Sequence, residues 1–281
     1  MSHYSVLVIG EYVQFKLAPF DENLEVPEYT KGQLGSNEIK SFIETYATYE
    51  KDKNYGAKSK KEAEENGKLS LEELYEKYGK DWNGNSWRKD EKGILSEYST
   101  YNPKSKWDWF EVGGRWAGKL KLKKGVDKSQ DDNVNFSWGW DEEDKEEILT
   151  KGFVDSALKK DIDFSPDKEA YDKAIRFWEM KVEGSKPIND EEKKILEWNF
   201  YKKEYYEKRY GTKERYAKQI SSFSTYAVLK NGVWYEAGEM GWFGMNNATP
   251  EEEGKFKDNF YDKFIKELPD RTKLTIVDCH I

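Results

Sequence analysis

The segment 225–281 constrains the fold more than any other part of this chain, because signals for strands, a turn and a helix follow one another without interruption. Asn231-Gly232 lies between two apolar runs and predicts a β-hairpin with a type I′ turn. Thr249-Pro250-Glu251-Glu252 predicts a helix start, with Thr at the N-cap, Pro at N1 and Glu at N3. A strand is predicted over 273–281. This order of hairpin, helix and strand is that of the second half of a ferredoxin-like unit.

The first strand of such a unit is predicted near the N-terminus. Residues 4–9 are apolar on both faces, as in a central strand, and Gly10 ends the run. We therefore predict an α+β fold with a ferredoxin-like antiparallel sheet, in which the first and last strands lie side by side. That pairing places His3 beside His280, and these are the only two histidines of the chain.

Large charged helical insertions interrupt this predicted core. Apolar residues recur with helical spacing from Ile39 to Tyr46, and Ser70-Leu71-Glu72-Glu73 matches a capping box. Residues 140–216 are predicted to be almost wholly helical, with Ser165-Pro166 opening one helix and Asn189 or a neighbour capping the next. The predicted domains are a core of residues 1–139 plus 217–281, with an inserted helical segment at about 36–80, and a helical insertion at 140–216.

Composition excludes several classes of protein. Charged residues make up 36% of the chain, but aromatic residues make up 16%, which predicts a folded protein because disordered chains lack aromatics. The net charge of -8 argues against a nucleic-acid clamp, so direct nucleic-acid binding is not expected. A single cysteine indicates a reducing compartment, and no apolar run is long enough to span a membrane. We expect a soluble cytoplasmic protein without membrane contact.

The block 106–116 packs three tryptophans, two carboxylates, an arginine and a Gly-Gly pair into a short stretch. We predict a hairpin or bent strand pair that turns near Gly113-Gly114. Tryptophans offer stacking surfaces, and arginine offers a planar fork that binds phosphate or carboxylate bidentately. The alternative for each of these residues is a purely structural role in a tightly built core. Trp242, from the aromatic loop 238–244, is a further candidate. The candidate ligand-binding residues are therefore Trp107, Asp108, Trp109, Arg115, Trp116 and Trp242.

Catalytic motifs give little support for an enzyme. The chain has no GxGxxG, GxxxxGK[ST] or GxSxG pattern, so dinucleotide, P-loop and α/β-hydrolase chemistry are not expected. His3 and His280, with Asp278 and Cys279, hold the ingredients of a small metal site or an acid/base pair, but no ligand spacing supports it. Residues 131–142 imitate a calcium loop, except that a phenylalanine takes the place of the required glycine. We predict no catalytic residue, no cofactor and no metal.

Five blocks of the sequence resemble, in the same order, those of a family of uncharacterised bacteriophage proteins. The resemblance covers about a fifth of the chain and implies a phage accessory protein that acts in the cytoplasm of a bacterial host. The family brings no established activity. The matching blocks are His3–Gly10, Leu17–Asn23, Lys106–Trp116, Gly238–Gly244 and Thr275–Ile281.

This resemblance, together with the absence of enzyme motifs, favours a binding function over catalysis. We expect an anti-defence protein that binds a bacterial immune effector stoichiometrically and inhibits it, such as a CRISPR effector or a signalling nuclease. The alternative is a protein that sequesters or cleaves a small immune signalling nucleotide, with the base stacked on tryptophan and phosphate held by Arg115. For the first function, the insertion at 140–216 offers four aromatic side chains that could fill pockets on a partner. The alternative is that they fill seams between the helices of the insertion itself. They are Trp178, Trp198, Tyr201 and Tyr205.

Overall fold

The computed structural model describes residues 2–51, 56–79, 85–89, 91, 93–126, 152–241 and 244–281. The chain forms two compact units, one of Met1–Ala18 with Lys106–Ile281 and one of Pro19–Ser105. These boundaries differ from the predicted ones, since residues 152–216 belong to the same unit as the sheet. The predicted calcium-like segment at 131–142 lies outside the described residues.

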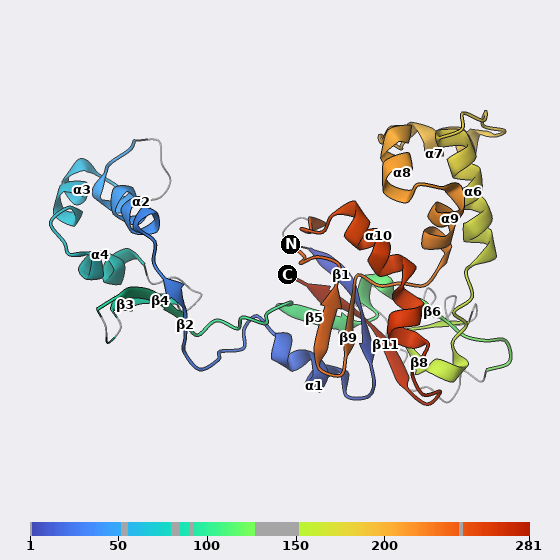
Figure 1. The fold of residues 1–281 in the computed structure, drawn as a ribbon, viewed down its shortest axis with the longest axis horizontal. Helices are drawn as coiled ribbons and strands as arrows, with labels where there is room; N and C mark the ends of the chain where they lie inside the picture. The colour runs from blue at the N-terminus through green and yellow to red at the C-terminus, as the bar shows by residue number, and fades with distance from the viewer. Residues whose placement is uncertain are drawn as a thin grey trace. The chain divides into compact units, whose positions relative to one another are not determined.

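The larger unit is built on a mixed sheet with the strand order β10-β9-β1-β11-β5, in which β8 also pairs with β11 (Figure 1). β1 and β11 are antiparallel neighbours along their whole length, from His3↔His280 to Ile9↔Leu274. Residues 4–9 are buried, as predicted for a central strand. The strands of this sheet are β1 (His3–Ile9), β5 (Trp109–Val112), β8 (Ser156–Leu158), β9 (Ala227–Lys230), β10 (Val233–Glu236) and β11 (Lys273–His280).

The predicted all-antiparallel sheet is wrong at one pair of strands, because β1 and β9 run parallel, with Leu7 opposite Val228. Parallel neighbours need a long crossover connection, and the chain between β1 and β9 provides one. The hairpin signal itself is confirmed: Asn231 and Gly232 have φ values of 53° and 73°, the positive values of a type I′ turn. That signal fixes the hairpin but does not fix which of its strands meets β1.

One face of this sheet carries the main hydrophobic core. Side chains from β1 and β11, such as Leu7 and Ile276, pack with Phe260 and Phe264 from the last helical segment. That segment starts with α10 (Pro250–Asp258) and continues into a π-helical turn at Tyr261–Ile265. The predicted capping box of Thr249 and Glu252 is present. Burying such side chains contributes roughly 1.5–3 kcal/mol each, so this contact secures the sheet.

The segment predicted to be almost wholly helical contains four helices in its described part, but it also contains two strands and a 3-10 turn over 153–161. The small strand β7 (Phe153–Val154) pairs with β6 (Leu120–Lys121). Asn189 caps a helix as predicted, whereas the N-cap predicted at Ser165 lies at Asp167. The helices are α6 (Lys168–Lys181), α7 (Asp190–Glu197), α8 (Lys203–Tyr210) and α9 (Lys213–Ser221), and α1 (Val13–Leu17) precedes them in the chain.

Among its described residues, the smaller unit has a three-stranded sheet in the order β2-β4-β3 and three α-helices that fall within the segment predicted at 36–80. Phe42, Tyr75 and Trp87 are in aromatic contact with one another, with 4.4 Å between the ring centroids of the stacked Tyr75 and Trp87. The capping box predicted at Ser70 is present. The elements are β2 (Tyr29–Gln33), α2 (Ser36–Ala47), α3 (Lys60–Asn66), α4 (Leu71–Tyr78), β3 (Asn85–Lys89) and β4 (Leu95–Ser99).

A membrane-spanning helix would have to be longer and more apolar than any helix in the described part of the chain.

Candidate functional site

The tryptophans of the 106–116 block have different environments. Trp107 is only 7% exposed, and its indole N–H donates to the Leu17 carbonyl at 3.1 Å. Trp116 is half-buried and packs against the main core. Both rings therefore have partners in the core, which fits the structural alternative named for them. Trp109 alone of the three is substantially exposed, at 48%.

The predicted hairpin at Gly113-Gly114 is also corrected. β5 ends before this pair, and the chain then makes a 3-10 turn at Gly114–Trp116. Both glycines have positive φ values, of 75° and 54°, so the chain turns sharply after β5 and lies against Asp278 of β11 instead of returning beside β5.

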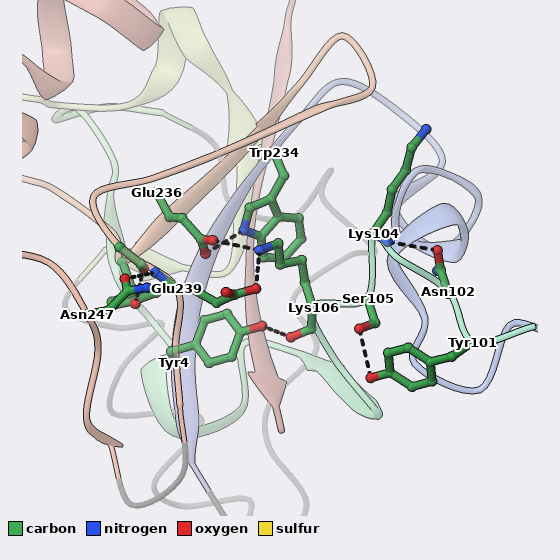
Figure 2. Close-up of polar contacts among 12 residues, drawn as sticks. Tyr4, Tyr101, Asn102, Lys104, Ser105, Lys106, Trp234, Glu236, Glu239 and Asn247 are labelled. Atoms are coloured by element: carbon green, nitrogen blue, oxygen red, sulfur yellow. Dashed lines mark hydrogen bonds and ion pairs between the residues drawn. The ribbon is translucent and has the colours of Figure 1, made fainter. Parts of the chain in front are cut away.

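The start of the block is fixed to the sheet by polar contacts, as Figure 2 shows. The Tyr4 hydroxyl donates to the Lys106 carbonyl, and Lys106 Nζ contacts Glu236 at 2.8 Å and Glu239 at 3.0 Å. The Asp108 N–H then donates to the His280 carbonyl at 3.0 Å. These contacts hold the backbone of Asp108 against the end of β11.

His3 and His280 meet across the β1/β11 pair, with 4.8 Å between their ring centroids and an edge-to-face geometry. His3 Nδ1 lies 3.0 Å from Oδ1 of Asp278, and His280 Nδ1 lies 2.6 Å from Oδ1 of Asp108. A carboxylate can only accept a hydrogen bond, so each Nδ1 carries the proton in its contact. Nε2 of each ring is then the atom that can take up or release a proton. We call these four residues the histidine cluster.

The two carboxylates of the histidine cluster have different surroundings. The Asp278 side chain is 2% exposed and also accepts the Arg115 backbone N–H at 3.0 Å. A Cβ at Gly114 would lie 2.3 Å from the Asp278 Cβ, so only glycine fits there. The Asp108 side chain is 39% exposed. The buried carboxylate of Asp278 is thus fixed by the turn at Gly113-Gly114. The exposed carboxylate of Asp108 is positioned by the hydrogen bond from its backbone N–H to the His280 carbonyl.

Trp109 forms one side of the histidine cluster. Its ring centroid lies 6.1 Å from that of His3 and 6.5 Å from that of His280, edge-on to both. Arg115 is exposed. Trp242, the remaining candidate ligand residue, lies outside the described residues. Within the described ranges, no three or more His, Cys, Asp or Glu side chains are arranged so that they could hold a metal ion together.

The sequence prediction did not name Asp155 as a candidate functional residue. Asp155 is fully buried and lies between β7 and β8 in the chain. Its Oδ1 accepts the Gly118 N–H at 2.6 Å, and its Oδ2 has no hydrogen-bond partner in the described part of the chain. Burial raises the pKa of this carboxyl to about 7, opposed by the Gly118 bond and assisted by the nearby charge of Glu111. An acidic residue inside an apolar run, Phe153-Val154-Asp155, was the available sequence signal.

The aromatic residues of the helical segment also divide into two groups. Trp178 is 4% exposed and packs on Tyr216 between α6 and α9, so it lies in a seam between these helices, the alternative role named for it. Tyr205 is half-buried and stacks on Tyr201 with 4.2 Å between centroids. The predicted contact residues Trp198 and Tyr201 are exposed.

Trp198 and Tyr201 belong to a larger exposed apolar group around α7. The highest exposed fractions are 93% for Phe200, 81% for Trp198 and 80% for Ile188. Large apolar side chains are seldom left this exposed in neighbouring positions unless they serve a contact. We call this group the arm surface, and its residues are Ile188, Ile195, Trp198, Phe200 and Tyr201.

Polar contacts anchor the chain beneath the arm surface. Arg176 on α6 pairs with Glu192 on α7 through two nitrogen atoms, at 3.0 and 2.8 Å. Lys181 Nζ donates to the Asn199 carbonyl at 2.9 Å, and the Asn199 side chain donates to the Tyr206 hydroxyl at 2.6 Å. Bidentate arginine–carboxylate pairs impose a defined geometry. The backbone that carries Trp198 and Phe200 is therefore held on both sides.

Comparison with family models, curated proteins and solved structures finds no match to this chain. The resemblance to bacteriophage proteins therefore stays a prediction.

Proposed function

We propose that this chain acts by binding a protein partner through the arm surface, and that the partner is a bacterial defence protein. The observation that carries the proposal is the exposure of Trp198 and Phe200, at 81% and 93%, two positions apart. Tryptophan and other aromatic residues supply most of the binding energy in protein interfaces, where they fill pockets on the partner.

The charges around the arm surface support a protein partner over a nucleic acid or a membrane. Residues 186–204 contain as many lysines as acidic residues. Nucleic-acid sites and anionic membrane sites both rely on an excess of positive charge. A neutral surface with exposed aromatic side chains is typical of a protein contact that depends on burial.

The anchoring contacts beneath this surface support the same proposal. The Arg176–Glu192 pair and the Lys181–Asn199 contact hold the segment before any partner arrives. Ordering a loop on binding costs free energy, and a surface that is already ordered avoids part of that cost.

The identity of the partner rests on the resemblance to bacteriophage proteins. A phage accessory protein without enzyme motifs fits a stoichiometric inhibitor of host immunity. CRISPR effectors and signalling nucleases are the first candidates to test.

The experiment is calorimetry with purified defence effectors of these two classes, using the full chain and the double variant Trp198→Ser/Phe200→Ser. We expect binding at a fixed ratio, weakened at least roughly thirtyfold by the double variant, since one hot-spot side chain contributes about 2 kcal/mol. The matched control is Phe15→Ser, because Phe15 is 82% exposed but lies on α1. The proposal fails if the double variant binds as tightly as the parent chain. It also fails if the arm surface binds lipid vesicles or a second copy of this chain instead.

A further inference from the structure

The histidine cluster holds the parts of a general acid–base pair, which is a function separate from partner binding. Its two imidazoles are in contact, and each Nδ1 is bonded to its own carboxylate. A carboxylate on Nδ1 fixes the tautomer and orientation of an imidazole and stabilises its protonated form. Both histidines of the chain are used in this one place.

The two halves of the cluster are not equivalent. His3 relies on a buried carboxylate that also holds a backbone N–H, whereas His280 relies on a carboxylate that is 39% exposed. An acid–base pair works with one imidazole in its neutral form and the other in its protonated form. One imidazole can then act as the base while the other acts as the acid.

No side-chain nucleophile is available beside the pair among the residues that the structure describes there. Cys279, between Asp278 and His280 in β11, points to the opposite face of the sheet and is fully buried. Ser5, opposite Asp278, is buried and accepts the Tyr226 N–H at 3.2 Å. The attacking group at this pair is then either a hydroxyl of the substrate or a water molecule, and a substrate that lacks the hydroxyl separates the two.

The half-exposed ring of Trp109 points to the kind of substrate. An exposed indole provides a stacking surface for a nucleobase. A ribonucleotide combines a flat base with a 2′-hydroxyl next to a phosphodiester. The chain's net charge of -8 favours a small nucleotide over a long nucleic acid.

We propose that His3 and His280 form an acid–base pair that cleaves a small ribonucleotide at its phosphodiester, with the base stacked on Trp109. The neutral imidazole takes the 2′-hydroxyl proton at Nε2 while that oxygen bonds to phosphorus. The protonated imidazole gives its Nε2 proton to the 5′-oxygen as the bond between that oxygen and phosphorus breaks. The products are a 2′,3′-cyclic phosphate and a free 5′-hydroxyl. The protein ends with its two protonation states exchanged, and solvent restores them.

The test is cleavage of uridylyl-(3′,5′)-adenosine by the full chain, followed by chromatography. We expect His3→Gln and His280→Gln each to lower the rate by roughly a hundredfold or more, the usual contribution of a general acid or base. The 2′-deoxy analogue should resist cleavage, and a metal chelator should leave the rate unchanged. Circular dichroism checks that each variant is folded.

Asp108→Asn gives a second test, at a side chain that is more exposed than either histidine and whose substitution is less disruptive to folding. Asp108 is a positioning residue, so its loss should lower the rate and displace the pH–rate profile, which a merely structural loss would not do. Besides Asp108, the charged residues placed next to the pair are Asp278, which contacts His3, and Glu111, which is in register with Asp278. Arg115 contacts Asp278 through its backbone N–H, and its side chain is exposed. The control is Asp262→Asn, which removes an exposed carboxylate that is paired with Lys266.

Four results would overturn the proposal. They are no cleavage by the parent chain, an unchanged rate in both histidine variants, equal cleavage of the deoxy analogue, or loss of activity with the chelator and recovery with zinc. The last result would make the histidines metal ligands.

Discussion

The 106–116 block and the arm surface both contain tryptophan and phenylalanine, but Trp107 in the first and Trp198 in the second have different environments. Trp107 is 7% exposed and its indole N–H is bonded to a carbonyl, whereas Trp198 is 81% exposed. Aromatic content alone therefore does not separate a core from a contact surface. What separates them is whether a distant part of the chain covers the ring.

The polar contacts of the two regions differ in the same way. His3 and Asp278 are 275 positions apart in the chain, whereas Asn199 and Tyr206 beneath the arm surface are 7 apart. The geometry of the histidine cluster thus depends on the sheet topology. The geometry of the arm surface depends on local helix contacts, so the two regions should respond differently to substitution.

The largest difference is expected between two tryptophan variants. Trp107→Ala removes a buried indole and its hydrogen bond, and should lower the free energy of unfolding by about 3–5 kcal/mol. Trp198→Ala should change it by less than about 0.5 kcal/mol, because an exposed ring has few contacts to lose. Chemical denaturation followed by circular dichroism measures both values. Equal losses would remove the distinction between the two regions.

The pH dependence of stability should belong to the sheet region. The pKa of Asp155 is raised in the folded state to about 7, from a value near 3.8 when exposed. Its contribution to stability is therefore complete below about pH 4 and is lost as the pH rises through 7, by up to about 4 kcal/mol.

Asp155→Asn should abolish this slope, while Asp190→Asn, at an exposed position on α7, should retain it. Unfolding curves between pH 4 and pH 8 measure the difference. If the free energy of unfolding falls equally with pH in the parent chain and in Asp155→Asn, Asp155 is not the source of the pH dependence.

A smaller effect should distinguish two glycines. Gly114→Ala meets both a positive φ of 54° and the Asp278 side chain, and should cost about 2–3 kcal/mol. Gly184, between α6 and α7, also has a positive φ, of 80°, but a Cβ there would meet nothing within 4 Å. Gly184→Ala should cost only about 1 kcal/mol. Thermal unfolding compares the two variants. Equal losses of stability would mean that the contact of Gly114 with Asp278 does not contribute to the cost of the substitution.

Local signals predicted the local structure well. The capping boxes at Ser70 and Thr249 and the turn at Asn231 are confirmed because each depends on a few adjacent residues. The parallel pairing of β1 with β9 depends on the path of a long connection, and no local pattern encodes it.

The candidate site was predictable only in part. The sequence prediction placed His3 beside His280 from strand order, and the structure has that contact. The sequence prediction also named Asp278 with the two histidines, and Asp278 does contact His3. The contact of Asp108 with His280 was not predicted, because Asp108 reaches His280 only after the chain has been fixed at Lys106 and Trp107. Trp178 and Trp198 could not be separated by sequence, since burial depends on packing between helices.

The most direct test of the account is the tautomeric state of the two histidine rings, measured by long-range ¹H–¹⁵N correlation NMR on the full chain above neutral pH. The histidine cluster predicts that both neutral rings carry their proton on Nδ1, and that Asp108→Asn changes the signals of His280 more than those of His3. A neutral ring with its proton on Nε2, at either position, would contradict the central claim that each imidazole is held by its own carboxylate.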